Sequence, residues 1–153
     1  MMQATPHQGY WSSDNTHRLP VRVYYEDTDF TGVVYYANYL KFFERGRTDA
    51  LRCLGVHHAA LLEAETPLGF AVRKITVEYE RPARIDDALL VATQFKAAKG
   101  ARFEILQQIH KGEQLIAKAG VEAVCIDLSG RPKRLPVDLV ERLGDFSVDD
   151  LKA

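Results

Sequence analysis

The hydrophobic pattern along the chain changes its period, and the change separates a short strand and a long helix from a later sheet. Val21, Val23 and Tyr25 alternate with Arg22 and Tyr24, and this twofold period predicts a strand. From residue 36 to residue 54, apolar residues recur at three- and four-residue steps. This spacing predicts an amphipathic helix with one buried stripe. We expect the stripe to consist of Tyr39, Leu40, Phe43, Ala50, Leu51 and Leu54.

Beyond residue 70 the period becomes twofold, as in half-buried antiparallel strands. Alternating runs at residues 75–80, 89–95, 103–109 and 115–126 are separated by turns that contain glycine or proline. No helix connects these strands in the pattern, so we predict an α+β fold in which one antiparallel sheet wraps around the long central helix. Gly46 lies inside that helix, where glycine costs about 1 kcal/mol relative to alanine, and a close approach of the sheet or of another helix would explain it.

The two ends of the chain lack this periodicity. Residues 1–18 are polar and predict a flexible lead, residues 137–143 predict a short helix, and residues 144–153 form an acidic tail. Residues 19–143 are therefore expected to form a single domain, which is enough chain for a hydrophobic core.

The bulk composition excludes several classes of protein. A net charge of −1 argues against a nucleic-acid binder, which is usually basic. No apolar run approaches the roughly 20 residues that span a bilayer, so we expect no transmembrane segment. The N-terminus lacks the features of a secretory signal, and the two cysteines show no metal-binding or disulfide spacing. We therefore expect a cytoplasmic protein with reduced thiols and no metal.

The strongest candidate chemistry lies in the polar turn between the first strand and the helix. Asp27, Asp29 and Gly32 fall within seven residues, immediately before the helix N-terminus. Free N–H groups and the positive end of the helix dipole would then lie beside a carboxylate, which could act as a nucleophile or a base. The alternative for Asp29 is a helix-capping or turn aspartate. Asp27 is expected to brace the turn.

These residues also carry a resemblance to a known family. The segment 25–29 (YEDTD), followed by 32–35 (GVVY), 38–40 (NYL) and 81–83 (RPA), resembles the 4-hydroxybenzoyl-CoA thioesterase family. Within that family the chain is most similar to the YbgC branch, the acyl-CoA thioesterases associated with the Tol-Pal system. The resemblance spans most of the chain. It implies a hotdog fold, acyl-CoA hydrolysis with Asp29 as the catalytic carboxylate, and homodimers that assemble into homotetramers.

The implied reaction needs little apparatus, because a thioester is readily attacked and a thiolate leaves without acid assistance. One ionised carboxylate and donors for the oxyanion suffice. The resemblance assigns the backbone N–H of Tyr36 as the oxyanion donor, which makes Asp29 and Tyr36 the expected catalytic residues. The YbgC branch usually has histidine where this chain has Tyr36, and this departure leaves the acyl chain length and the choice between aromatic and aliphatic substrates open.

Substrate-binding residues are predicted on two kinds of surface. Gly32 is expected to keep the loop open for the approach of the thioester. The acyl pocket is expected to involve Val33, Val34 and Tyr39, with core packing as an equal alternative for these three. Coenzyme A phosphates call for exposed cations. The candidate cations are Lys99, Arg102, Arg131, Lys133 and Arg134.

Other readings of the same residues stay open. Glu44 on the helix is a second candidate carboxylate. A non-catalytic module that binds acyl-CoA or an acyl carrier protein is the alternative function, and an acyl carrier protein is also a candidate partner of the enzyme. We expect no cofactor, because coenzyme A would be part of the substrate.

Overall fold

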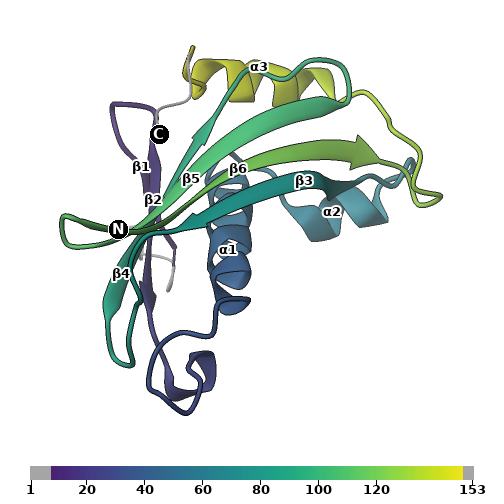
Figure 1. Ribbon diagram of the computed structural model, residues 1–153. Coiled ribbons are helices and arrows are strands. Elements are labelled where there is room, and N and C mark those ends of the chain that lie inside the picture. The colour runs from purple at the N-terminus through teal and green to yellow at the C-terminus, as the bar shows by residue number, and fades with distance from the viewer. Residues whose placement is uncertain (1–7, 150–153) are drawn as a thin grey trace, which may run out of the picture.

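One antiparallel sheet wraps around a single long helix in the computed structural model, which describes residues 8–149 (Figure 1). The six strands lie in the order β1-β2-β4-β5-β6-β3. The hotdog fold and the α+β class are thus confirmed. The elements are β1 (Tyr10–Trp11), β2 (His17–Arg22), a 3-10 turn η1 (Tyr25–Asp27), α1 (Asn38–Cys53), α2 (His58–Glu63), β3 (Gly69–Tyr79), β4 (Ala88–Phe95), β5 (Arg102–Lys111), β6 (Gln114–Ile126) and α3 (Val137–Asp145).

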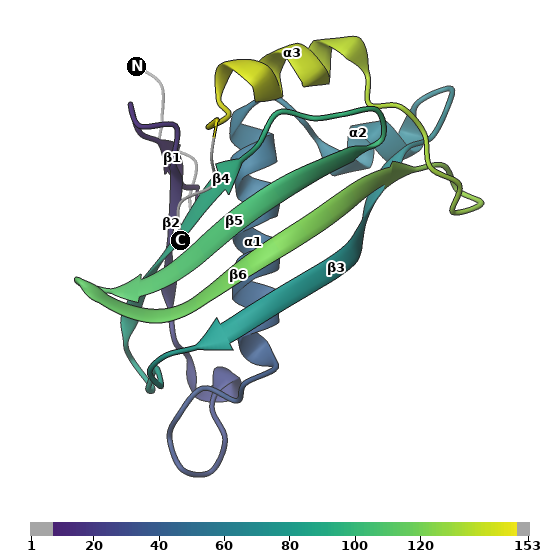
Figure 2. The ribbon, with the colours of Figure 1, turned by 45° about the horizontal axis from the view of Figure 1, so that its top comes forward.

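The concave face of the sheet packs on α1, which crosses behind the strands in Figure 2. Small side chains on the inward face of β6 allow this close wrapping, as the alternation predicted. Ala117, Ala119, Val121, Ala123 and Cys125 are all buried there.

Gly46 is the point of closest approach between α1 and the sheet. A Cβ atom at this position would lie 2.6 Å from Val91 Cγ1 and 3.0 Å from Gln107 Nε2. Gln107 is fully buried, and its amide donates hydrogen bonds to Phe43 O (2.8 Å) and Thr93 Oγ1 (2.9 Å). The predicted close approach of the sheet is therefore confirmed as the reason for this glycine.

Strand β3 forms one edge of the sheet. Its eleven residues pair with β6 from Gly69↔Ile126 to Tyr79↔Ala117. Among the described residues no strand pairs with its other side. An exposed edge of this length is a template for pairing with another chain.

The N-terminal part differs from the predicted pattern. The strand begins at His17 and ends at Arg22, and Tyr25 lies in the 3-10 turn. His17 is completely buried, and its Nε2 lies 2.9 Å from the Asp49 carboxylate on α1. A prediction based on hydropathy does not detect a buried polar pair of this kind. Leu40, which we expected in the buried stripe, is 40% exposed.

The end of α1 and the position of α3 agree with the prediction. Gly55 ends α1 in the left-handed conformation (φ +87°), which glycine adopts without strain. The helix α3 follows at the predicted place. Among residues 8–149, the structure has no helix of the length and apolar character that crossing a membrane requires.

Candidate active site

Asp29 lies at the tip of a tight turn and organises it through its carboxylate. Its Oδ1 accepts hydrogen bonds from the Thr31 hydroxyl (2.6 Å) and the Thr31 backbone N–H (2.8 Å). These two donors, the hydroxyl first, hold the pKa of Asp29 below its usual value. Gly32 closes the turn at φ +83°. The carboxylate is therefore ionised at neutral pH.

The turn belongs to a short hairpin-like loop that returns to the start of α1. Thr28 and Val34 form an antiparallel bridge, and Asp29 N–H donates to Val33 O at 2.9 Å. At the base of the loop, Asp27 is buried; its backbone O accepts the Tyr35 N–H at 3.0 Å. The Asp27 carboxylate also accepts the Tyr24 N–H (2.8 Å), so its bracing role agrees with the prediction.

The loop is fastened to the connection between β3 and β4, which contains the second part of the family pattern. Ala83 is fully buried; its O accepts the Val34 N–H (2.8 Å) and its N–H donates to Tyr39 Oη (2.9 Å). Val34 and Tyr39 are themselves buried in the core. In a single chain, Val34 and Tyr39, which we predicted in the acyl pocket, are therefore core residues that fix the loop to the β3–β4 connection.

Asp87 lies at the end of the same β3–β4 connection and stabilises that end of it. Its carboxylate accepts the Arg84 N–H at 2.8 Å and pairs with Lys111 Nζ at 2.9 Å. Burial raises the pKa of this group, but the Arg84 N–H and the Lys111 ammonium outweigh burial and lower the pKa below its usual value.

The start of α1 leaves backbone donors free beside this loop. Neither Tyr36 N–H nor Ala37 N–H donates a hydrogen bond within residues 8–149, whereas Tyr35 N–H and Asn38 N–H are both engaged. Free donors at a helix N-terminus form a ready site for an oxyanion. The Tyr36 side chain is exposed and lies edge-on to Tyr79, with ring centroids 6.3 Å apart.

A second turn in the protein has the same local structure as the Asp29 turn. Asp127 Oδ1 accepts the Ser129 hydroxyl (2.6 Å) and the Ser129 N–H (2.9 Å), and Gly130 has φ +86°. The turn alone therefore does not mark a catalytic carboxylate. What distinguishes Asp29 is that its loop leads directly into α1, where the Tyr36 and Ala37 N–H groups make no hydrogen bond within residues 8–149.

The predicted cations come together at the other end of the molecule. Leu135 N–H donates to Gly100 O (3.1 Å), which places the β4–β5 turn against the segment after β6. Figure 1 shows the loop after β6 at the right of the view, far from the β2–α1 loop at the bottom. We call the following exposed set the basic cluster: Lys99, Arg102, Arg131, Lys133 and Arg134.

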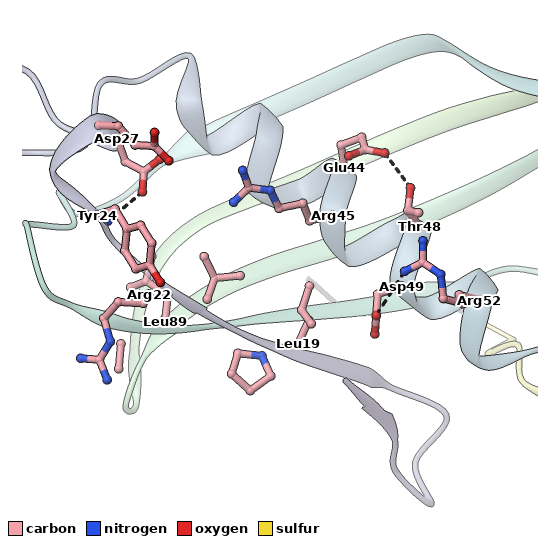
Figure 3. Close-up of a pocket in the computed structure, with 14 residues that line it drawn as sticks. Leu19, Arg22, Tyr24, Asp27, Glu44, Arg45, Thr48, Asp49, Arg52 and Leu89 are labelled. Carbon is pink, nitrogen blue, oxygen red and sulfur yellow. Dashed lines mark hydrogen bonds and ion pairs between the residues drawn. The ribbon is translucent and has the colours of Figure 1, made fainter. Parts of the chain in front are cut away.

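A large cavity lies between β2 and α1, as Figure 3 shows. It measures about 660 Å³ and is lined by Tyr24, Glu44, Arg45 and Arg52 among others. Neither Asp29 nor Tyr36 lines it. Glu44, the second candidate carboxylate, accepts the Thr48 hydroxyl at 2.6 Å and is exposed to solvent.

Three metal-ligating side chains converge beneath the N-terminal strands, namely His17, Asp49 and Cys53. Asp49 Oδ2 already accepts the Gly9 N–H (2.7 Å) and lies 2.9 Å from His17 Nε2. Cys53 Sγ is 3.7 Å from the same oxygen, and burial raises the pKa of its thiol. The cluster is thus a polar network whose atoms bond to one another, and nothing in it points to a bound ion.

Two further side chains were not singled out for binding from the sequence. Arg47 and His58 line a separate cavity between α1 and the first half of β3. They come from different helices and meet only in the folded chain, so no motif in the sequence marks them as a pair.

Comparison with known proteins places this chain in a family. The profile of the thioesterase-like superfamily matches residues 23–143. A Haemophilus influenzae protein named acyl-CoA thioesterase YbgC is 45% identical over 115 residues, covering 75% of this chain and 84% of the relative. A 1,4-dihydroxy-2-naphthoyl-CoA hydrolase from Nostoc punctiforme is 30% identical over 129 residues, covering 84% and 85%.

A solved structure agrees with these sequence matches. The probable thioesterase from Bartonella henselae superimposes with a TM-score of 0.77 at 43% identity, covering 79% of this chain and 99% of that one. This chain therefore belongs to the thioesterase-like superfamily and is a YbgC-like thioesterase.

Proposed function

We propose that this thioesterase hydrolyses acyl-CoA to a free acid and coenzyme A, with Asp29 as the reacting carboxylate and Tyr36 N–H as an oxyanion donor. The observation that carries the proposal is the ionised Asp29 turn, held by its loop beside the unbonded N–H groups at the start of α1. The names of its relatives, among them the acyl-CoA thioesterase of Haemophilus influenzae, support the same substrate class.

The chemistry follows from these groups. Asp29 either attacks the thioester carbon, forming a mixed anhydride that water then hydrolyses, or removes a proton from a water molecule that attacks directly. In both routes the carbonyl oxygen becomes an oxyanion, and the Tyr36 N–H stabilises it together with the helix dipole. The C–S bond breaks and coenzyme A leaves as a thiolate, which takes a proton from solvent.

One chain does not bring all the predicted binding residues together, because the basic cluster and Asp29 lie at opposite ends of the molecule (Figure 1). The exposed edge of β3 connects these two ends. Its Gly69 end pairs with Ile126, which also bridges to Pro132 in the segment of the basic cluster. At its other end, Tyr79 Oη donates to Tyr36 O at 3.4 Å. The strand spans roughly 35 Å between them.

A second copy of the chain would complete the site. If β3 pairs antiparallel with β3 of another copy, the Tyr79 end of one strand lies beside the Gly69 end of the other. The Asp29 loop of one subunit then faces the basic cluster of its partner, which can bind the phosphates of coenzyme A. Exposed aromatic side chains near this edge, such as Phe30, Tyr36 and Tyr79, would be covered by the same pairing. The association of such dimers into tetramers stays a prediction.

The test is the Asp29→Asn variant, because asparagine keeps the acceptor for both Thr31 donors and removes only the charge. We expect kcat for acyl-CoA hydrolysis to fall on the order of a hundredfold or more, with the melting temperature nearly unchanged. Asp127→Asn is the matched control, since it makes the same change in the same kind of turn. Because Asp127 lies 3.9 Å from Lys133 Nζ, its effect should be confined to KM and stability.

The assay should cover aliphatic and aromatic acyl-CoAs, because the sequence leaves this choice open. Near-normal kcat in Asp29→Asn on the best substrate would refute the assignment and direct attention to Glu44. A protein that binds acyl-CoA but hydrolyses none of the panel would instead support the non-catalytic binding module.

A further inference from the structure

A second cavity, of about 380 Å³, opens between α1, α2 and the first half of β3. Its apolar wall includes Leu51, Phe70, Val72 and Phe103. Ligand pockets of this size and character are ordinary sites for small organic groups. Asp29 does not line this cavity, whereas Glu44, the second candidate carboxylate, and Arg52 lie at its border.

His58 contributes an unsatisfied polar atom to this region. It is the first residue of α2, and its ring stands edge-on to Phe70 with centroids 5.5 Å apart. Its Nε2 is buried and has no hydrogen-bond partner among residues 8–149. Burial lowers the pKa of the imidazole, so the ring is neutral at pH 7. A buried ring nitrogen of this kind is stabilised when a ligand supplies the missing partner.

Arg47 contributes a positive charge without an ion-pair partner. Its Nη1 donates to Gln107 Oε1 at 3.0 Å, and no carboxylate lies within 4.0 Å of its guanidinium in the described part of the chain. Glu44 acts on Arg47 only at longer range, because its carboxylate accepts the Thr48 hydroxyl instead. A guanidinium has five N–H donors, so most of its capacity to bind oxygen remains unused.

In the proposed dimer, this cavity would lie close to the Asp29 loop of the partner subunit. Phe70 and Val72 belong to the half of β3 that begins at Gly69. In the antiparallel pairing, this half lies beside the partner's Tyr79 end and therefore beside the partner's Asp29 loop. An acyl group whose thioester is at that loop can extend into the cavity, with its far end between α1 and α2.

We propose that the cavity holds the acyl group and that Arg47 and His58 determine specificity by binding an oxygen-bearing group at its far end, preferentially a carboxylate. This inference rests on the proposed function. A carboxylate satisfies the unpaired guanidinium with a charge-assisted hydrogen bond and can accept one from His58. A hydroxyl supplies the same hydrogen bonds without the charge and is the weaker match. A plain hydrocarbon chain of the same length leaves both side chains unsatisfied.

The experiment compares three six-carbon substrates, hexanoyl-CoA, 6-hydroxyhexanoyl-CoA and adipoyl-CoA. For the unmodified enzyme we expect kcat/KM to rise in that order, with adipoyl-CoA at least about tenfold above hexanoyl-CoA, as one charge-assisted hydrogen bond provides. Arg47→Gln keeps a donor for Gln107 and removes the charge, so the preference for adipoyl-CoA should disappear. His58→Phe keeps the ring against Phe70 and should reduce the preference for both oxygenated substrates.

Arg45→Gln is the matched control, because Arg45 lies two residues away on the outer face of α1 and does not line this cavity. It should leave the substrate ratios unchanged. Equal kcat/KM for the three substrates in the unmodified enzyme would overturn the proposal. So would an Arg47→Gln variant that changes the oligomeric state but not the ratios, because Arg47 would then face a side chain of the partner.

The two proposals fail in different ways. If Asp29→Asn retains full hydrolysis, the catalytic assignment is wrong, but the substrate ratios still measure the cavity. If Asp29→Asn is inactive and the ratios do not respond to Arg47→Gln or His58→Phe, only the specificity proposal is wrong.

Discussion

Replacing Gly46 with alanine tests how closely α1 and the sheet pack. The added methyl carbon would lie 2.6 Å from Val91 Cγ1, 3.0 Å from Gln107 Nε2 and 3.1 Å from Thr93 Oγ1. Val91 is fully buried and branched at Cβ, so its side chain has little freedom to move. Either α1 shifts away from β4 and β5, or the hydrogen bonds of Gln107 are distorted.

The magnitude is the difference between two opposing effects. Overpacking a core by one methyl group costs about 1–3 kcal/mol, and weakening the Gln107 hydrogen bonds adds about 0.5–1.5 kcal/mol for each bond. Alanine recovers about 1 kcal/mol of helix propensity. With both Gln107 amide hydrogen bonds affected, net destabilisation of about 1–5 kcal/mol is therefore expected. In a protein of this length, each kcal/mol lowers the melting temperature by about 2–4 °C.

The measurement is urea unfolding followed by circular dichroism, with thermal melts on the same samples. Gly144→Ala provides a matched control, because Gly144 lies in α3 and a Cβ there would meet nothing within 4 Å. That variant should be as stable as the unmodified protein or more stable by up to about 1 kcal/mol. If Gly46→Ala were equally stable or stabilised, the close contact would not constrain the fold, and our reason for this glycine would be refuted.

Two further predictions concern assembly and pH. Light scattering at micromolar concentration should give a dimer or a tetramer because β3 needs a partner, and a fully active monomer would contradict the composite site. Burial lowers the pKa values of His17, His58 and His110 below the unfolded value of 6.5. Stability is therefore complete above about pH 6.5 and falls at lower pH, because the unfolded chain binds protons that the folded chain excludes. Thermal melts from pH 8 to pH 5 should show this decline, and His17→Gln should make it shallower; equal slopes would refute the assignment to His17.

The long elements were predictable because each buries one continuous face. Alternation located β3 to β6, and the three- and four-residue spacing located α1, since most inward positions are apolar or small and the buried polar exceptions, Asp49, Thr93 and Gln107, are too few to hide the period. The same reasoning misplaced Leu40. Its spacing fits the buried stripe, but it lies on the flank of α1 and is 40% exposed. Spacing alone does not show how far around the helix the sheet extends.

The N-terminal strands were harder to predict because polar pairs hold them in place. His17 is buried against Asp49, 32 residues away, and Gly9 N–H donates to the same carboxylate. Each residue taken alone is typical of a solvated segment. Hydropathy therefore assigned residues 1–18 to a lead, whereas the sheet already includes Tyr10–Trp11 and begins its second strand at His17.

The candidate site was predictable where it is local and not where it depends on tertiary contacts. The Asp29 turn and the start of α1 are neighbours in sequence, so their proximity followed from the pattern. The five cations come from two distant segments that meet through a single backbone hydrogen bond between Leu135 and Gly100. Arg47 and His58 share a cavity only because α1 and α2 both approach β3. No spacing rule relates residues of that kind.

The two aspartate turns show why local structure does not establish function. Asp29 and Asp127 are each followed by an exposed apolar residue, a hydroxyl residue and a left-handed glycine, and each carboxylate accepts the same two kinds of donor. In both, these donors lower the pKa of the carboxyl group, the hydroxyl contributing most. Ionisation and turn geometry therefore cannot distinguish a reacting carboxylate from a structural one. The two turns differ in their surroundings: Asp127 lies 3.9 Å from Lys133 Nζ in the basic cluster, whereas the Asp29 loop leads directly into α1, where the Tyr36 and Ala37 N–H groups make no hydrogen bond within residues 8–149. A carboxylate that attacks a thioester needs donors for the oxyanion that forms, so the proposed role of Asp29 rests on these donors and not on its turn, and the paired Asp29→Asn and Asp127→Asn variants test it.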